Sequence, residues 1–320
     1  KRVTNFDRAK MFNTSDEWIQ KRTGIVERRY AEEGVYCSDL ALEASKEALK
    51  SAGMKAEDLD FIIFATLSPD HMFPGSGCYL QPKLGLTEIG AMDIRTQCTG
   101  FIYSLATADA FVKTGMYKRI LVVGAEIQSS DLNFTDEGRD VAVIFADGAG
   151  AVIVGPSEDP SRGILSSHLH ADGSFADLLK VEMFDISKKP CLTHEMLDRG
   201  IQWPKMQGKD VFRVAVTKMP EVIEEALKAN NLKVEDVDLF IPHQANQRIT
   251  KAAMKTLHLS NEKVFMNLDR YGNLSAASEM VALCEAAEQG RIKDGDLVVL
   301  VAFGAGLSWA AMALRWQPKG

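Results

Sequence analysis

The sequence predicts an α/β protein made by tandem duplication of one α/β unit. Residues 47–64, EALKSAGMKAEDLDFIIF, match residues 225–242, EALKANNLKVEDVDLFIP, in residue type and order. The similarity continues downstream, where both copies read as strand, tight junction, helix and strand. No Pro- or Ser-rich linker separates the copies, so we place the halves at 1–160 and 161–320. Such halves favour two sheets packed around shared central helices, with a pseudo-twofold axis.

Each repeated element has a local reason to form. The first helix of each copy is expected to end at Gly53 or Asn231, the residue types that most easily adopt a left-handed C-cap. In each copy a Glu-Asp pair then opens a short turn before a β-rich run. Next come a strand, a junction and an amphipathic helix ended by Gly, in GAMDIRTQCTGFIYSLATADAFVKTG and in VFMNLDRYGNLSAASEMVALCEAAEQG. Further β-rich runs, KRILVVGAE and GDLVVLVAFGAG, precede a Gly-rich alternating stretch in each half. Residues 181–206 have no counterpart in the first half and are interpreted as a cap over a pocket.

Composition excludes several classes of protein. The 320 residues are 46% hydrophobic and 25% charged, which is typical of a globular chain and not of a disordered or fibrous one. The formal charge of −7 argues against general nucleic-acid binding. Five scattered cysteines without paired spacing suggest neither a disulfide framework nor a zinc site. Without a signal-like stretch or a long apolar run, we expect a cytoplasmic protein that does not enter a membrane.

Three residues are candidates for chemistry. Cys98 lies between a predicted strand and a helix start, where the helix dipole favours a thiolate; the alternative is a buried structural cysteine. His243 follows the apolar end of a predicted strand, although a histidine there is more often a satisfied core or turn residue. Asn273 occupies the strand-to-helix junction that corresponds to that of Cys98, and alone it reads as a turn or N-cap residue.

Together the three residues favour a shared site, because the duplication places each at a strand end beside the pseudo-twofold axis. Papain-like hydrolases also use Cys, His and Asn, but no matching context surrounds Cys98. The set fits a nucleophile plus two neutral hydrogen-bond donors aimed at an oxygen that becomes negative. His168 and His170 alternate along a probable strand, but without a third ligand at diagnostic spacing we predict no metal site.

The sequence resembles β-ketoacyl-acyl-carrier-protein synthase III over nearly its whole length. The resemblance is carried by TSDEWIQKRTGI, TQCTGF, FADGAGA, HLHADGS, PHQANQRI and YGNLSAAS. It implies a thiolase-like layered fold with mixed five-stranded sheets around central helices. It also implies a decarboxylative Claisen condensation of acyl-CoA with malonyl-acyl carrier protein, through an acyl-Cys98 intermediate. The expected partners are these two substrates and a second copy in a homodimer, with no cofactor beyond the CoA thioester.

The resemblance also implies site residues. Cys98, His243 and Asn273 match the catalytic residues, and the backbone N–H groups of Cys98 and Ala305 match the oxyanion hole. Residues matching those that bind CoA or line the substrate tunnel are Trp18, Arg22, Phe73, Arg139, Met206, Gly208, Phe212 and Asn246, of which Phe73 is expected to cross the dimer interface. Arg248, Lys251 and Lys255 recur at helical spacing and form a basic stripe, which together with a nearby Arg213 is expected to dock the acidic carrier protein; the alternative is a solvated helix face.

The chain departs from the family pattern in four places. It begins where the family has completed its first strand, which predicts an exposed sheet edge if that strand is absent. Leu274 stands where the family commonly has Thr, Glu279 brings a charge into a usually apolar helix, and the 181–206 segment contains FDISKKP. Three alternatives therefore stay open: a paralogue with longer or specialised acyl groups or a CoA-bound acceptor, a cysteine thioesterase, and a catalytically silent subunit.

Overall fold

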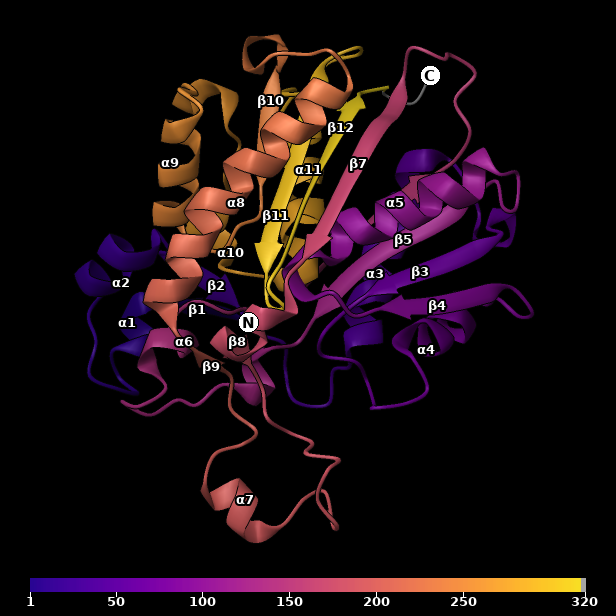
Figure 1. Cartoon of the computed structure of the whole chain (residues 1–320). Helices are drawn as coiled ribbons and strands as arrows, with labels where there is room; N and C mark the ends of the chain where they lie inside the picture. Colours follow the sequence, from indigo (N-terminus) through magenta and orange to yellow (C-terminus); the bar gives the residue numbers. More distant parts are fainter. Residues whose placement is uncertain (318–320) are drawn as a thin grey trace.

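The computed structural model describes residues 1–317 and contains two four-stranded mixed sheets, one from each half of the chain (Figure 1). The first sheet has the order β4-β3-β5-β6, with β3 parallel to β4 and β5, and β6 antiparallel to β5. The second has the order β10-β11-β12-β7, with only β10 and β11 parallel. The strands are β3 (Phe61–Ala65), β4 (Gly90–Ile94), β5 (Ile120–Glu126), β6 (Gly148–Val154), β7 (Gly163–Ala171), β10 (Leu239–Pro242), β11 (Leu297–Gly304) and β12 (Ser308–Arg315).

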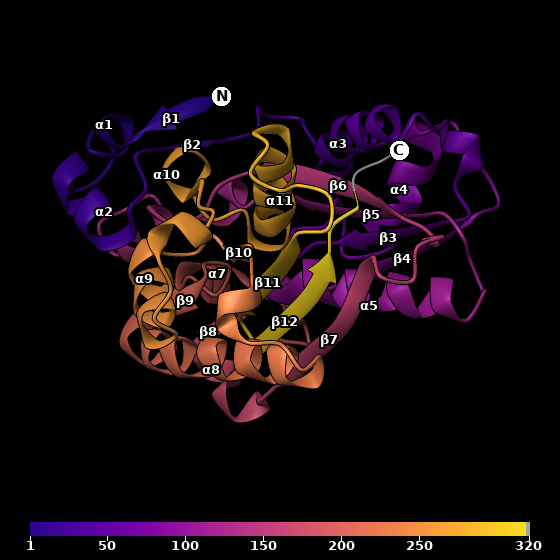
Figure 2. The same cartoon turned by 90° about the horizontal axis from the view of Figure 1, so that it is seen from above.

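Helices form the layers between and outside the sheets (Figure 2). Side chains of α5 (Gly100–Lys113) and α11 (Ser278–Glu288) share one core with the inner faces of both sheets. The outer face of the first sheet is covered by α3 (Cys37–Ala52) and α4 (Ser76–Lys83), and that of the second by α8 (Gly208–Ala229) and α9 (Gln247–Thr256). Consecutive strand residues point to opposite faces, so strands buried on both faces are apolar throughout.

Shorter elements complete the fold, most of them around the N-terminal segment and in the loops. They are β1 (Arg2–Thr4), α1 (Asn5–Arg8), α2 (Asp16–Thr23), β2 (Glu27–Arg29), α6 (Arg139–Ala142), β8 (Leu179–Lys180), α7 (His194–Asp198), β9 (Lys205–Met206) and α10 (Leu268–Tyr271). The 3₁₀ turns are η1 (Ala56–Asp58), η2 (Gln97–Thr99), η3 (Ser129–Asp131), η4 (Gly173–Leu178), η5 (Val234–Asp236), η6 (Asn261–Lys263) and η7 (Ser275–Ala277). Among residues 1–317, no helix combines the length and apolar character that crossing a bilayer requires.

The two predicted copies share the local geometry of their turns. Gly53 and Asn231 both adopt the left-handed conformation, with φ of 54° and 55°. The turns that follow are equivalent as well: the Asp58 carboxylate accepts the Lys55 N–H at 2.9 Å, and Asp236 accepts the Lys233 N–H at 2.8 Å. The two copies thus use the same side-chain cap to set the chain entering β3 and β10.

The expectation of five strands per sheet is wrong for the described residues. In the second half, the predicted strand VFMN only bridges to β10, through Val264 opposite Phe240 and a 2.9 Å bond from the Phe265 N–H to the Phe240 carbonyl. It is held between η6 and α10, which leaves too few extended residues for a ladder. In the first half, Arg2–Thr4 pair with Glu27–Arg29, so β6 forms the edge of its sheet.

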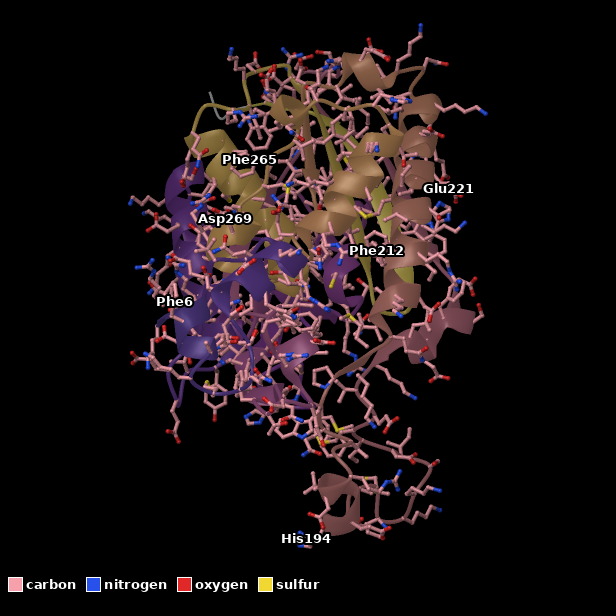
Figure 3. The ribbon with its side chains drawn as sticks, turned by 90° about the vertical axis from the view of Figure 1, so that its left-hand side faces the viewer. Phe6, His194, Phe212, Glu221, Phe265 and Asp269 are labelled. Atoms are coloured by element: carbon pink, nitrogen blue, oxygen red, sulfur yellow. The ribbon has the colours of Figure 1, made fainter. Side chains whose placement is uncertain are left out.

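The segment between β8 and β9 does not cover the body of the protein, contrary to the expected cap. It extends away from the sheets and carries α7 at its far end, where Figure 3 labels His194 (Figures 1 and 3). Phe184 and Ile186 are 39% and 79% exposed, and α7 contributes no buried residue. In this conformation, side chains that a cap would bury face solvent instead.

Candidate active site

Cys98 lies in η2, between the end of β4 and the start of α5. Gln97 before it has a φ of 48°, and this left-handed residue turns the chain sharply from strand to helix. Cys98 itself is 5% exposed. The first N–H groups of α5 have no partner within the helix, and their positive partial charge favours a thiolate nearby. The structure thus places Cys98 at a junction between a strand and a helix.

The end of β11 approaches Cys98 closely. A Cβ atom built on Gly304 would lie 2.6 Å from the Cys98 Cβ and 3.2 Å from its Sγ, so only glycine fits without displacement. Ala305 follows Gly304, and its carbonyl accepts the Ser308 hydroxyl at 3.2 Å. Ser308 also lies 3.0 Å from the Thr99 hydroxyl, which links this turn to the residue after Cys98. The structure therefore brings Ala305 to the neighbourhood of Cys98.

His243 follows β10 and faces Cys98 from the second half of the chain. Its N–H donates to the Val301 carbonyl at 2.7 Å, and the residue is 3% exposed. Burial lowers the pKa of His243, but the negative charges of Cys98 and Glu279 outweigh burial and raise it to about 10. An imidazole with a raised pKa beside a thiol is an arrangement that could activate the sulfur as a nucleophile.

Asn273 is buried in the loop between α10 and η7. Its N–H donates to the Ile144 carbonyl at 2.9 Å, and its own carbonyl accepts the Ala146 N–H at 3.0 Å, so both halves hold this loop. The side-chain Oδ1 accepts the Ser275 N–H at 2.7 Å. The oxygen is thus occupied, and the NH₂ end of the amide is the one left to donate.

The counterpart of Cys98 in the duplication is Ala276, which corrects the sequence alignment by a few residues. Ser275, with a φ of 47°, takes the place of Gln97, so Ala276 takes that of Cys98. Asn273 lies at the same junction but earlier in it. The two junctions touch, because a Cβ on Gly100 would lie 2.9 Å from that of Ala276.

Glu279 belongs to this site, although sequence analysis treated it only as a departure from the family. It is fully buried in the first turn of α11, and its Oε2 lies 3.5 Å from His243 Nδ1. Burial raises the pKa of Glu279, while the charge of His243 acts in the opposite direction. The signal in the sequence that could have indicated this role is a carboxylate in an otherwise apolar helix start, because buried carboxylates are rare unless they are paired.

Trp18 is stacked between two guanidinium groups at the protein surface. The Arg22 and Arg139 guanidinium carbons lie 4.5 Å and 4.6 Å from the centre of its ring. Arg139 is further held by donating to the Asn13 carbonyl at 2.7 Å. The structure thus assembles three of the predicted CoA residues, from α2 and α6, into one aromatic and cationic cluster of the kind that suits an adenine nucleotide.

Most of the other residues predicted to bind CoA or line the tunnel lie around α8 and α9. His243, Asn246 and Phe303 line a small pocket together with Met219, Ala245 and Ile249. Asn246 also caps α9 by accepting the Arg248 N–H at 2.9 Å. Met206 lies in β9 and packs against two of the hydrophobic cores, and Gly208 begins α8. Phe73 lies elsewhere, 81% exposed in the loop after β3.

The predicted basic stripe is exposed on one helix. Arg248, Lys251 and Lys255 project to solvent from α9. The Arg248 guanidinium lies 5.8 Å from the ring centre of Phe212, a residue of α8 that Figure 3 labels. Arg213 follows Phe212 and pairs with Asp210 at 2.9 Å, so part of its charge is already neutralised.

His168 and His170 point to the same face, as alternation along a strand predicts, and both contact Glu225. The distances from the ring nitrogens to the carboxylate oxygens are 3.1 Å and 2.6 Å. Within residues 1–317, no three His, Cys, Asp or Glu side chains are arranged to hold a metal ion. The two histidines therefore act here as hydrogen-bond partners of α8.

Comparison with known proteins decides the family. Residues 92–173 match the model of 3-oxoacyl-[acyl-carrier-protein] synthase III, and residues 227–316 match that of its C-terminal part. The chain is 49% identical to β-ketoacyl-[acyl-carrier-protein] synthase III of Caldanaerobacter subterraneus over 98% of its own length and 94% of the relative's. The protein of Clostridioides difficile is 46% identical, with coverage of 98% and 93%. The chain belongs to the β-ketoacyl-acyl-carrier-protein synthase III family.

Solved structures of the synthase family share the fold. The enzyme of Aquifex aeolicus aligns with a TM-score of 0.91 at 43% identity, covering 99% of this chain and 96% of that one. The Thermus thermophilus enzyme gives 0.90 at 41% identity, with the same coverage of 99% and 96%. The predicted thiolase-like layered α/β fold is thereby confirmed, and the chain is an acyltransferase-type condensing enzyme.

Proposed function

We propose that this synthase joins the acyl group of an acyl-CoA to malonyl-acyl carrier protein, giving 3-oxoacyl-acyl carrier protein, CoA and CO₂, through an acyl-Cys98 intermediate. The observation that carries the mechanism is the buried pair of Cys98 and His243, contributed by opposite halves of the chain at the start of α5. Family membership supports the reaction, which begins fatty-acid synthesis.

In the first half-reaction, Cys98 Sγ gives its proton to His243 and attacks the thioester carbonyl of acyl-CoA. The backbone N–H groups of Cys98 and Ala305 donate to the oxygen of the tetrahedral intermediate. The carbon–sulfur bond to CoA then breaks, the departing CoA thiolate takes a proton from solvent, and His243 keeps the Cys98 proton on Nε2. CoA leaves and the acyl group remains on Cys98.

In the second half-reaction, the bond between the malonyl α-carbon and its carboxylate breaks and CO₂ leaves. The electron pair moves onto the thioester oxygen, to which His243 Nε2–H and the free NH₂ of Asn273 donate. The enolate carbon attacks the acyl-Cys98 carbonyl, and collapse of that intermediate releases the Cys98 thiolate. All charge stabilisation comes from side chains and backbone, so this scheme uses no metal or redox cofactor.

The partner sites follow from charge and exposure. The Trp18 cluster supports binding of the CoA adenine and phosphates, while Arg248, Lys251 and Lys255 on α9 support docking of acidic acyl carrier protein. Phe73, beside the 67% exposed Met72, supports an interface with a second copy, because adjacent large apolar side chains seldom stay in water. We propose a cytoplasmic homodimer.

A second candidate is a priming ketosynthase with specialised acyl groups. The priming β-ketosynthase of the R1128 polyketide pathway aligns with a TM-score of 0.90 at 31% identity, covering 100% of this chain and 93% of that one. The observation that favours this candidate is Leu274, which follows Asn273 and packs against Gly148. A leucine where the family commonly has threonine changes the volume beside the site.

Intact-mass spectrometry after mixing with acyl-CoAs of increasing length tests both candidates. The proposal predicts an acyl adduct on the wild-type protein with short acyl-CoAs and none on Cys98→Ala. A preference for medium or long chains would favour the specialised ketosynthase. Release of free acid instead of a condensed product would support a thioesterase and contradict the proposal, and an adduct on Cys98→Ala would remove Cys98 from its role.

A further inference from the structure

Glu279 and His243 form an isolated buried pair. Their side chains are 0% and 2% exposed, and 3.5 Å separates Oε2 from Nδ1. Within residues 1–317, neither carboxylate oxygen of Glu279 and neither ring nitrogen of His243 has a hydrogen bond. A buried carboxylate without a partner is strongly disfavoured, and among the described side chains the imidazole is the ionisable group that compensates Glu279.

The charges around the pair are few. Cys98 on η2 and Glu279 on α11 act on His243, and among the described ionisable groups His243 alone acts on Glu279. Of the other elements packed on α11, β6, η7 and β10 consist of uncharged residues, and the charged Arg270 of α10 pairs with Glu285 further along the helix. Because Nδ1 faces Glu279, Nε2 is the nitrogen directed at Cys98 and the reacting groups.

We propose that Glu279 is a positioning residue that holds a proton on the Nδ1 side of His243, so that Nε2 keeps its N–H for the thioester oxygen during decarboxylation. The inference rests on the proposed role of His243 in that step. It extends the site to a residue that touches neither substrate.

The pair works as a unit that carries two protons and no net charge. One proton lies on Nε2 and the other between Nδ1 and the carboxylate, whether the pair is imidazolium with carboxylate or imidazole with carboxylic acid. When one proton leaves, the carboxylate retains the Nδ1–H, and Nε2 becomes an acceptor. A ring in that tautomer cannot donate to the enolate oxygen, so decarboxylation stops.

The sign of the pH dependence follows. Because the histidine pKa is raised, the pair carries both protons and is productive at pH values below that pKa. It loses one proton, and becomes unproductive, as the pH rises through the pKa. Replacing Cys98 by Ala removes the thiolate contribution, so the loss should fall at a lower pH than the pKa of about 10 that His243 has beside both negative groups. A neutral amide at position 279 can donate to Nδ1 and fix the Nε2–H tautomer at every pH, which abolishes the loss.

The test measures CO₂ release from malonyl-acyl carrier protein against pH for Cys98→Ala, with and without Glu279→Gln. We expect an alkaline loss only where Glu279 is present. At neutral pH the Glu279→Gln protein should be about tenfold slower, because a charged donor forms a hydrogen bond about twice as strong as a neutral one. Glu285→Gln is the matched control. It removes a carboxylate from the same helix, but one that pairs with Arg270 at 2.7 Å and not with His243.

Superimposable pH profiles with and without Glu279 would overturn the inference and leave the proposed function intact. Absence of CO₂ release from Cys98→Ala with Glu279 present would instead contradict the role of His243 in the proposed function. If Glu279→Gln does not fold, Glu279→Met replaces it. If neither folds, ¹⁵N NMR of the histidine ring decides on the wild-type protein, where titration of the His243 Nε2–H tautomer at an ordinary pKa would refute the pairing.

Discussion

Replacement of Gly304 by Ala offers the sharpest test of the active-site geometry. The new Cβ would lie 2.6 Å from the Cys98 Cβ and 3.1 Å from its backbone nitrogen, whereas ordinary contacts begin at 3.4 Å. One of the two segments must therefore move by about 1 Å, a displacement that typically lowers reaction rates by about a hundredfold. The overpacking should also cost roughly 1–3 kcal/mol of unfolding free energy.

The assay is the rate of acyl transfer from acetyl-CoA to Cys98, followed by intact mass, together with thermal unfolding of the same preparations. Gly173→Ala is the control, because no atom lies within 4 Å of a Cβ built there and its φ is not positive. We expect slow acylation and a lower unfolding temperature for Gly304→Ala alone. Acylation at the wild-type rate in a folded Gly304→Ala protein would refute the argument that β11 positions the sulfur.

Two further predictions concern the partner sites. Trp18→Ala should raise the KM for acyl-CoA about tenfold, because two cation–π contacts of ~0.5–1 kcal/mol each are lost with the stacking surface. The KM for malonyl-acyl carrier protein should stay unchanged. Glu17→Ala on the same turn is the control, and equal changes in both KM values would contradict a CoA site. Lys251→Glu should lower kcat/KM for malonyl-acyl carrier protein about fivefold at low salt and less at high salt. Lys46→Glu on α3 is the matched charge reversal, and an equal loss there would contradict local docking.

Local sequence patterns predicted the structural features that are determined by residues close together in the chain. The left-handed Gly53 and Asn231, the strands after them, and the junction at Cys98 each follow from residues within one turn. The duplication then placed Cys98 and His243 each at a strand end beside the pseudo-twofold axis, so even this long-range encounter could be inferred. The clustering of Trp18 with Arg139 came from family resemblance, because no local pattern connects α2 to α6.

Features set by packing between distant elements escaped prediction. The contact of Glu279 with His243 depends on how α11 rests against the end of β10, and spacing along the chain does not reveal it. The alignment of Asn273 with Cys98 was displaced because the left-handed residue of each junction, Gln97 or Ser275, is not a glycine and gives no visible sign in the sequence. The VFMN run has strand composition, but η6 and α10 on either side restrict it to a single bridge.

The contact between Gly100 and Ala276 restricts how such an enzyme can diverge. The start of α5 and the turn η7 before α11 lie so close together that Gly100 cannot gain a side chain unless Ala276 is displaced. The contact between the two junctions beside Cys98 therefore restricts the residue type at Gly100 as well as the backbone position. New acyl specificities must arise elsewhere around the site, at side chains such as Leu274, which packs against Gly148 and can be made smaller without a clash.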